Sequence, residues 1–122
     1  KEDIVLYRSN SVPGQPYNGS MVLMSANARP QVWDRFDPAT AAATTAAAGF
    51  HGTDQAWMAH VLGPDEAAWD KSDGVMHFRL DCMPDLPEHA RIVFFPGVAK
   101  MHLPTTRKAA PWIDQRFPLS GA

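Results

Sequence analysis

Residues 52–62 read GTDQAWMAHVL, a stretch in which a polar start leads into an apolar helical face. Trp57 and Met58 are each followed four residues later by an aliphatic side chain, which is the spacing of neighbours on one helix face. The stretch therefore predicts a helix that packs on a core. Capping by Thr53 and the attraction of Asp54 to the positive helix end explain the first two polar residues. They do not explain the Gln and the Trp-containing face that follow, so the helix start is also a candidate site.

The segments upstream predict two more short helices joined by rigid turns. A helix that begins at Pro30 carries an apolar face of three residues up to Phe36. An alanine-rich helix over 39–48 follows, with Asp37 as its cap and Gly49 as its terminator. Short elements of this kind fit a chain that contains 11 prolines.

Downstream, Gly63-Pro64 ends the central helix, and residues 65–69 are expected to form a further turn. The acids Asp65-Glu66 and the pair Asp70 and Asp73 resemble a carboxylate cluster. Because they follow Gly-Pro and precede Asp-Gly, we interpret them as helix-start and turn acids rather than as a catalytic pair. Residues 111–117 predict a short helical turn near the end of the chain.

Three continuous apolar runs, over residues 4–7, 21–24 and 91–95, have the pattern of strands buried on both faces. The last is expected to be central in the sheet. Residues 76–81 alternate between apolar and polar side chains, which predicts a strand with one polar face and places His77 toward solvent. Together the runs and helices predict a single α/β domain over 1–122, with a mixed sheet and flanking helices.

Composition excludes several classes of partner. Hydrophobic residues make up 45% and charged residues 20% of the 122 residues, with a formal net charge of -2, which is typical of a folded domain. Acids and bases are interspersed, so neither nucleic acid nor an anionic membrane surface is an expected partner. No apolar run approaches the roughly 20 residues that span a bilayer, and no signal-peptide pattern is present. A cytoplasmic protein without a membrane span is therefore expected.

Common catalytic and metal-binding motifs are also lacking in the sequence. There is no phosphate-binding glycine loop, zinc helix or nucleophile elbow. The single Cys82 has no Cys or His at zinc-ligand spacing and is expected to be a small buried thiol. His51 and His60 flank Asp54, but their spacing does not favour a metal site over ordinary surface histidines.

Three polar stretches remain as candidate site residues: Asn18 to Ser20, Asp54-Gln55, and Gly97 to Lys100. Each stands at the end of an apolar run or at a helix start. Ligands in α/β sheets collect at strand ends, so these stretches are expected to share a cleft.

In this order the stretches resemble the C-terminal half of retaining glycosyltransferases of the glycogenin and bacterial galactosyltransferase type, particularly small bacterial and phage-borne relatives. The resemblance rests on four segments of this chain: Tyr17-Asn18-Gly19-Ser20-Met21-Val22-Leu23-Met24, Val32-Trp33-Asp34-Arg35-Phe36, Gly52-Thr53-Asp54-Gln55-Ala56-Trp57, and Gly97-Val98-Ala99-Lys100. It implies the latter half of a GT-A fold and a nucleotide-sugar donor, with a UDP-sugar expected, and a carbohydrate-like acceptor.

The resemblance also implies residue roles. Asn18 and Asp54 would contact hydroxyls of the donor sugar, with Ser20 and Gly97 belonging to the same binding segments. Gln55 would lie beside the anomeric carbon, and Lys100 would neutralise the leaving diphosphate. Because an uncharged amide is a poor covalent nucleophile, Gln55 is expected to position or stabilise rather than to bond covalently.

The family uses a divalent metal, Mn²⁺ or Mg²⁺, held by an Asp-x-Asp pair and a His ahead of the Gly-x-x-Lys. This chain contains no Asp-x-Asp, and residues 94–96 have no His. The chain is therefore expected to be the C-terminal part of a larger hexosyltransferase, supplying the sugar and acceptor side of the site, and inactive by itself. The alternative is a non-catalytic carbohydrate-binding or assembly module, in which the helix start only caps itself.

Overall fold

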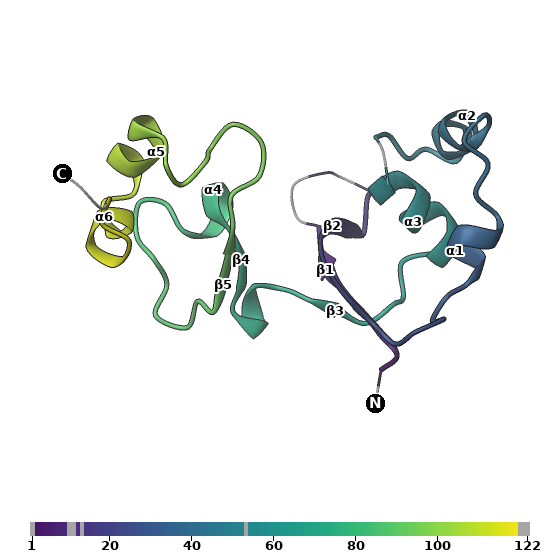
Figure 1. Ribbon diagram of the computed structural model, residues 1–122, viewed down its shortest axis with the longest axis horizontal. Helices are drawn as coiled ribbons and strands as arrows, with labels where there is room; N and C mark the ends of the chain where they lie inside the picture. The colour runs from purple at the N-terminus through teal and green to yellow at the C-terminus, as the bar shows by residue number, and fades with distance from the viewer. Residues whose placement is uncertain (1, 10–11, 13, 53, 120–122) are drawn as a thin grey trace. The chain divides into compact units, whose positions relative to one another are not determined.

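The computed structural model describes residues 2–9, 12, 14–52 and 54–119, which divide into two compact units that meet in sequence between Trp69 and Asp70 (Figure 1). The elements of the first unit are β1 (Ile4–Arg8), β2 (Tyr17–Met24), α1 (Gln31–Asp34), α2 (Ala41–Ala47), α3 (Asp54–Leu62) and β3 (Ala68–Trp69). Those of the second are the 3₁₀ turn η1 (Lys71–Asp73), β4 (Val75–His77), α4 (Phe78–Asp81), β5 (Ile92–Phe94), α5 (Pro104–Ala109) and α6 (Trp112–Arg116). The assignment of 1–122 to a single domain stays a prediction.

The first unit is built on a mixed sheet of three strands in the order β2-β1-β3. β1 is antiparallel to β2 and parallel to β3, and the helices lie between β2 and β3 in the chain. Ile4, Leu6 and Tyr17 form its core, and Met58 and Leu62 of α3 pack against them. The predicted α/β class with a mixed sheet is therefore confirmed, as is the apolar face of the central helix.

Two expectations about these strands are wrong. Residues 21–24 form the outer half of β2, but they are not buried, and Leu23 is 60% exposed. The physical reason is that β2 is an edge strand, paired with β1 alone in the described sheet. The segment expected to be a turn over 65–69 ends in β3, where Leu6 pairs with Ala68.

The helix ends follow the predicted chemistry, although one boundary moves. The carboxylate of Asp37 accepts hydrogen bonds from the Ala39 N–H (2.9 Å) and the Thr40 hydroxyl (3.1 Å). It thereby shapes a turn before α2, so the helix begins two residues later than expected. Gly49 adopts a φ of 85° at the end of α2, a conformation that glycine accepts without steric cost. The predicted cap Thr53 lies outside the described residues.

The second unit contains a two-stranded parallel sheet, β4-β5. Its core combines Met76 and Phe78 with Trp112 and Ile113 of α6. Residues 91–95 were expected to be a central strand, which is wrong: β5 has β4 as its one partner in the described sheet, and Ile92 is exposed. Met76 of β4 shares this core with residues of α6.

The strand predicted over residues 76–81 from alternating apolar and polar side chains is wrong. The strand ends at His77, and Phe78–Asp81 turn into helix because the Asp81 carboxylate accepts the His77 backbone N–H at 2.9 Å. His77 is therefore not solvent-facing. Its side chain is 8% exposed, and Nδ1 has no hydrogen-bond partner within the described part of the chain. Burial lowers the pKa of His77, against the opposing influence of Asp81.

We expect the second unit to lose stability between pH 7 and pH 5 because of His77. Its folded-state pKa lies below the unfolded value of about 6.5, so the unfolded chain binds the proton more readily. The His77 contribution is present above that pH and is lost as the pH falls toward the folded-state pKa, with a slope of at most about 1.4 kcal/mol per pH unit. His77→Phe should flatten the dependence of the urea midpoint on pH. His102→Phe, at an exposed position, serves as the control and should not flatten this dependence. Equal slopes of urea midpoint against pH for the two variants would refute the role of His77.

Asp70, Asp73 and Cys82 have local structural roles. Asp70 accepts the Ser72 N–H and Asp73 accepts the Asp70 N–H, so these acids cap η1 as expected for turn residues. Cys82 is fully buried, as predicted, and burial raises its pKa to about 11. None of the helices in the described ranges combines the length and apolar composition needed to cross a membrane.

Candidate functional site

The start of α3 lies against the N-terminal half of β2, which brings together two of the three predicted polar stretches. A Cβ atom placed on Gly19 would stand 2.9 Å from Oδ2 of Asp54 and 3.6 Å from Cε of Met58. The strand backbone therefore approaches the Asp54 carboxylate as closely as a residue without a side chain allows. Asp54 is exposed and Gln55 half-buried, so the pair stands at the rim of the core as expected.

β2 is irregular at this point of contact. Its register with β1 runs from Leu6 opposite Val22 directly to Tyr7 opposite Asn18, so residues 19–21 bulge out of the ladder. Bulges re-aim side chains and occur frequently beside functional sites. This one falls on the Gly-Ser-Met that follows Asn18 in the predicted sugar-binding segment.

Asn18 holds the bulge through its side chain. Its Oδ1 accepts hydrogen bonds from the Ser20 backbone N–H at 2.8 Å and from the Ser20 hydroxyl at 2.5 Å. The Asn18 side chain is buried and Ser20 is exposed. The Asn18 oxygen is thus used locally, and any ligand contact from this side chain would come from its amide N–H groups.

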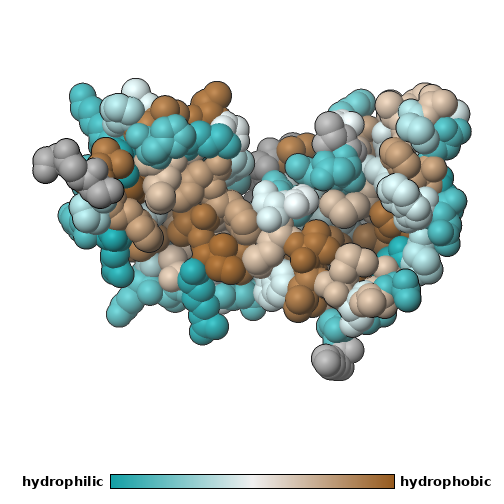
Figure 2. Space-filling model, in the orientation of Figure 1, coloured by the Kyte–Doolittle hydropathy of each residue, from teal (hydrophilic) through white to brown (hydrophobic). Residues whose placement is uncertain are grey.

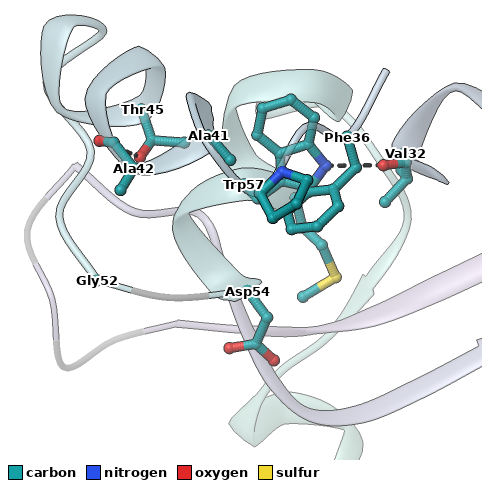
Figure 3. A pocket seen from close by; sticks show the side chains of 10 residues that line it. Val32, Phe36, Ala41, Ala42, Thr45, Gly52, Asp54 and Trp57 are labelled. Atoms are coloured by element: carbon teal, nitrogen blue, oxygen red, sulfur yellow. Dashed lines mark hydrogen bonds between the residues drawn. The ribbon is translucent and has the colours of Figure 1, made fainter. Parts of the chain in front are cut away.

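A pocket of about 570 Å³ opens beside Asp54 among α1, α2 and α3 (Figure 3). Its lining is almost entirely apolar, and of the described residues that line it Asp54 alone carries a charge. Figure 3 shows the rings of Trp57 and Phe36 together on one side, with Asp54 extending away from them at the helix start. Pockets of this size and polarity commonly hold small ligands.

The aromatic side of the pocket is fixed by specific contacts. The Trp57 indole N–H donates to the Val32 carbonyl at 2.7 Å. Phe36 meets Trp57 edge to face with ring centroids 5.5 Å apart, and Trp33 stacks on Phe36 at 6.3 Å. Of the three residues predicted to share a face of the first helix, Val32 and Phe36 line the pocket, whereas Trp33 is 79% exposed. Sequence reasoning did not connect this aromatic face with Asp54, because the two stand about twenty residues apart.

The third polar stretch belongs to the second unit. Gly97 has a φ of 65° and begins an exposed loop, and Nζ of Lys100 donates to the Phe95 carbonyl at 3.3 Å. Asn18, Ser20, Asp54 and Gln55 all belong to the first unit. The structure thus brings the β2 and α3 residues together, and the assignment of Gly97 and Lys100 to the same site stays a prediction.

The divalent metal implied by the resemblance finds no ligand set in the described ranges. No group of three or more His, Cys, Asp or Glu side chains converges there, and such groups are the usual protein ligands of Mn²⁺ and Mg²⁺. His51 is exposed, and His60 packs its ring beside Trp57 at 5.7 Å rather than joining Asp54.

Comparison with known proteins gives no assignment: no protein-family model matches the chain, and neither a curated protein nor a solved structure matches it significantly.

Proposed function

We propose that the first unit provides the sugar-binding side of a glycosyltransferase that uses a nucleotide-sugar donor. The observation that supports this most directly is the approach of Gly19 to the Asp54 carboxylate. It joins two segments, Asn18 to Ser20 and Asp54-Gln55, that the sequence resemblance assigns to the donor sugar. They are more than thirty residues apart in the chain, and their meeting is a result of folding.

The chemistry of the site fits a sugar. A carboxylate accepts hydrogen bonds from hydroxyl groups, and such charge-assisted bonds are stronger than neutral ones. The apolar pocket beside Asp54 offers the Trp57 and Phe36 rings to the C–H face of a sugar ring. A negative charge at the rim would also stabilise positive charge that develops on the sugar ring during transfer. In this proposal Gln55 orients the sugar.

The proposal predicts that sugar binding depends on the position of the Asp54 carboxylate. Asp54→Asn should weaken binding of UDP-galactose or UDP-glucose about tenfold or more, because a charge-assisted hydrogen bond contributes roughly 1.5–3 kcal/mol. Gly19→Ala should weaken binding similarly, since the added methyl group would displace the carboxylate. The measurement is an amide-resolved NMR titration of the chain with Mg²⁺ present, with shifts expected near residues 18–21 and 54–58.

Stability and charge controls separate this role from a structural one. Gly19 does not have a positive φ, so Ala fits its backbone and should leave the thermal midpoint nearly unchanged. Asp85→Asn removes the same charge from an exposed position of the second unit and should bind like the original chain. Full affinity in Asp54→Asn, or a large loss of stability in Gly19→Ala, would contradict the proposal.

The same titration distinguishes the alternative of a carbohydrate-binding module. That alternative is favoured by the apolar character of the pocket, which suits a free sugar as well as a donor. A binding module would bind methyl galactoside or methyl glucoside as tightly as the UDP-sugar. A donor site would bind the UDP-sugar more tightly, and Gln55→Ala should weaken that binding.

A further inference from the structure

The second unit contains a pocket of its own, of about 340 Å³, which the proposed function does not use. Aromatic side chains form much of its lining, among them Phe95, Trp112 and Phe117. Two arginines, Arg91 and Arg116, line the same pocket and are exposed. The pocket thus combines a flat apolar surface with two cations.

The aromatic surface is held in place by the core beneath it. The Trp112 indole N–H donates to the Cys82 carbonyl at 2.9 Å. Its ring packs at an angle beside Phe95, with centroids 6.3 Å apart, and Phe95 stacks on Phe78 at 4.5 Å. Because Phe78 is fully buried, this part of the pocket is an extension of the hydrophobic core rather than a loose surface cluster.

A third arginine fixes the segments that bear the pocket. The guanidinium of Arg107, which is only 6% exposed, donates to the Met101 carbonyl at 3.3 Å and to the Phe117 carbonyl at 2.5 Å. Met101 and Phe117 both line the pocket. Arg107 also pairs with Asp114 at 2.5 Å, so its charge is satisfied within the unit. It organises the pocket and leaves ligand binding to the other two arginines.

Arg91 and Arg116 differ from Arg107 in the use of their guanidinium groups. Neither guanidinium makes a hydrogen bond or an ion pair with the residues that the structure describes. Arg91 is anchored at its base instead, because its Cγ lies close over Gly74 and its backbone N–H donates to the Gly74 carbonyl at 2.9 Å. Its position is set by the turn after η1, while the charged end remains available.

We propose that this pocket binds a small organic anion with a flat hydrophobic body, such as an aryl phosphate or an aryl carboxylate. The ring would pack on Phe95, Trp112 and Phe117, and the anionic group would be bound by Arg91 and Arg116. Arginine suits this task, because its planar fork donates two parallel hydrogen bonds to a phosphate or carboxylate. The volume lies at the lower end of the range for small-molecule sites. This pocket belongs to the second unit, whereas Asn18 and Asp54 of the proposed sugar site belong to the first.

The proposal is tested by titrating the whole chain with 1-naphthyl phosphate, 1-naphthol and inorganic phosphate, followed by amide-resolved NMR and calorimetry. Naphthyl phosphate should bind at least about tenfold more tightly than either fragment, because each supplies only one of the two interactions. Its shifts should centre on residues 91–95 and 112–117, and its affinity should fall as salt is raised. Equal binding of 1-naphthol, or shifts centred elsewhere, would overturn the proposal.

Charge-matched variants assign the effect to the two arginines. Arg91→Gln and Arg116→Gln should each weaken binding of naphthyl phosphate about tenfold, the loss expected for one charged hydrogen-bonding group. Arg79→Gln removes the same charge from an exposed position of the same unit that does not line the pocket, and it should bind like the original chain. A similar loss in all three variants would show a general effect of charge and would contradict a built site.

Discussion

Trp112→Ala is expected to lower the free energy of unfolding of the second unit by about 3–5 kcal/mol, the usual cost of removing a buried Trp or Phe. Trp112 is only 8% exposed and contacts the rings of Phe78 and Phe95. The truncation would leave a cavity and would also take the indole donor away from the Cys82 carbonyl. A unit of 53 residues rarely has more than about 3–5 kcal/mol of stability from its core. The variant should therefore be largely unfolded in this region.

The measurement is urea denaturation followed by far-UV circular dichroism, together with the NMR signals of residues 75–117. Trp112→Phe serves as the matched control, because it keeps an aromatic ring in the core and loses the indole N–H. It should cost about 1–3 kcal/mol, the penalty for an unsatisfied buried carbonyl. A loss below about 1 kcal/mol in Trp112→Ala would mean that the core does not depend on this side chain.

The surfaces of both units show why burial was harder to predict than element type. Hydrophobic side chains are visible on the surface of each unit (Figure 2). Among the hydrophobic residues with a large exposed fraction are Leu23 of β2 and Ile92 of β5. Both residues belong to continuous apolar runs, which are typical of central strands in larger sheets. A run of this kind predicts the strand correctly, but the number of strands beside it depends on long-range pairing that local sequence does not encode.

His77 illustrates a second limit. The alternation of apolar and polar residues around His77 fits a strand with one solvent-facing side. A segment of only four residues is too short for such a pattern to distinguish a strand from a helix. The choice is made by Asp81, whose carboxylate binds the His77 backbone N–H and favours a helical turn. Capping by Asp81 thus replaces the expected strand with a helical turn. As a result, the His77 side chain is buried instead of facing solvent. By contrast, Gly49 and Gly63 follow the ends of their helices as predicted. A left-handed glycine at a helix end depends only on neighbouring residues and can therefore be recognised in the sequence.

The candidate sugar site was partly predictable, because some of its parts have local sequence signals. The polar start of α3 can be recognised from residues 52–57 alone, and the β2 segment from its Asn-Gly followed by an apolar run. Their contact through Gly19 depends on the bulge in β2, which no pattern in the sequence predicted. The aromatic wall from α1 was likewise predicted as a helix face but not as part of a pocket.

Tyr17 connects the core of the first unit to this site. It is fully buried beside Ile4 and Leu6, at the residue directly before Asn18. Its hydroxyl oxygen accepts the Glu66 backbone N–H at 2.8 Å. The Glu66 carboxylate in turn pairs with Arg29 at 2.5 Å. The tyrosine therefore ties the start of β2 to the segment that leads into β3.

Tyr17→Ala is expected to destabilise the first unit by about 3–5 kcal/mol, as for other large aromatic truncations in a core. Because this approaches the whole stability that a core of this size provides, the variant should lose both the folded signals of residues 4–9 and 54–62 and any sugar binding. Tyr17→Phe keeps the ring and removes the acceptor of the Glu66 N–H, at a cost of about 1–2 kcal/mol. It should remain folded, and Asn18 to Ser20 should keep their contact with Asp54.

Thermal denaturation and NMR titration of the two variants together distinguish packing from the hydroxyl contact. Sugar affinity in Tyr17→Phe within about threefold of the original would show that the ring, rather than the hydrogen bond, positions the β2 bulge against α3. A fully folded Tyr17→Ala that still binds UDP-sugar would show that the bulge is held by Asn18 and Ser20 alone. In that case the aromatic residue before Asn18 would have no part in forming the site.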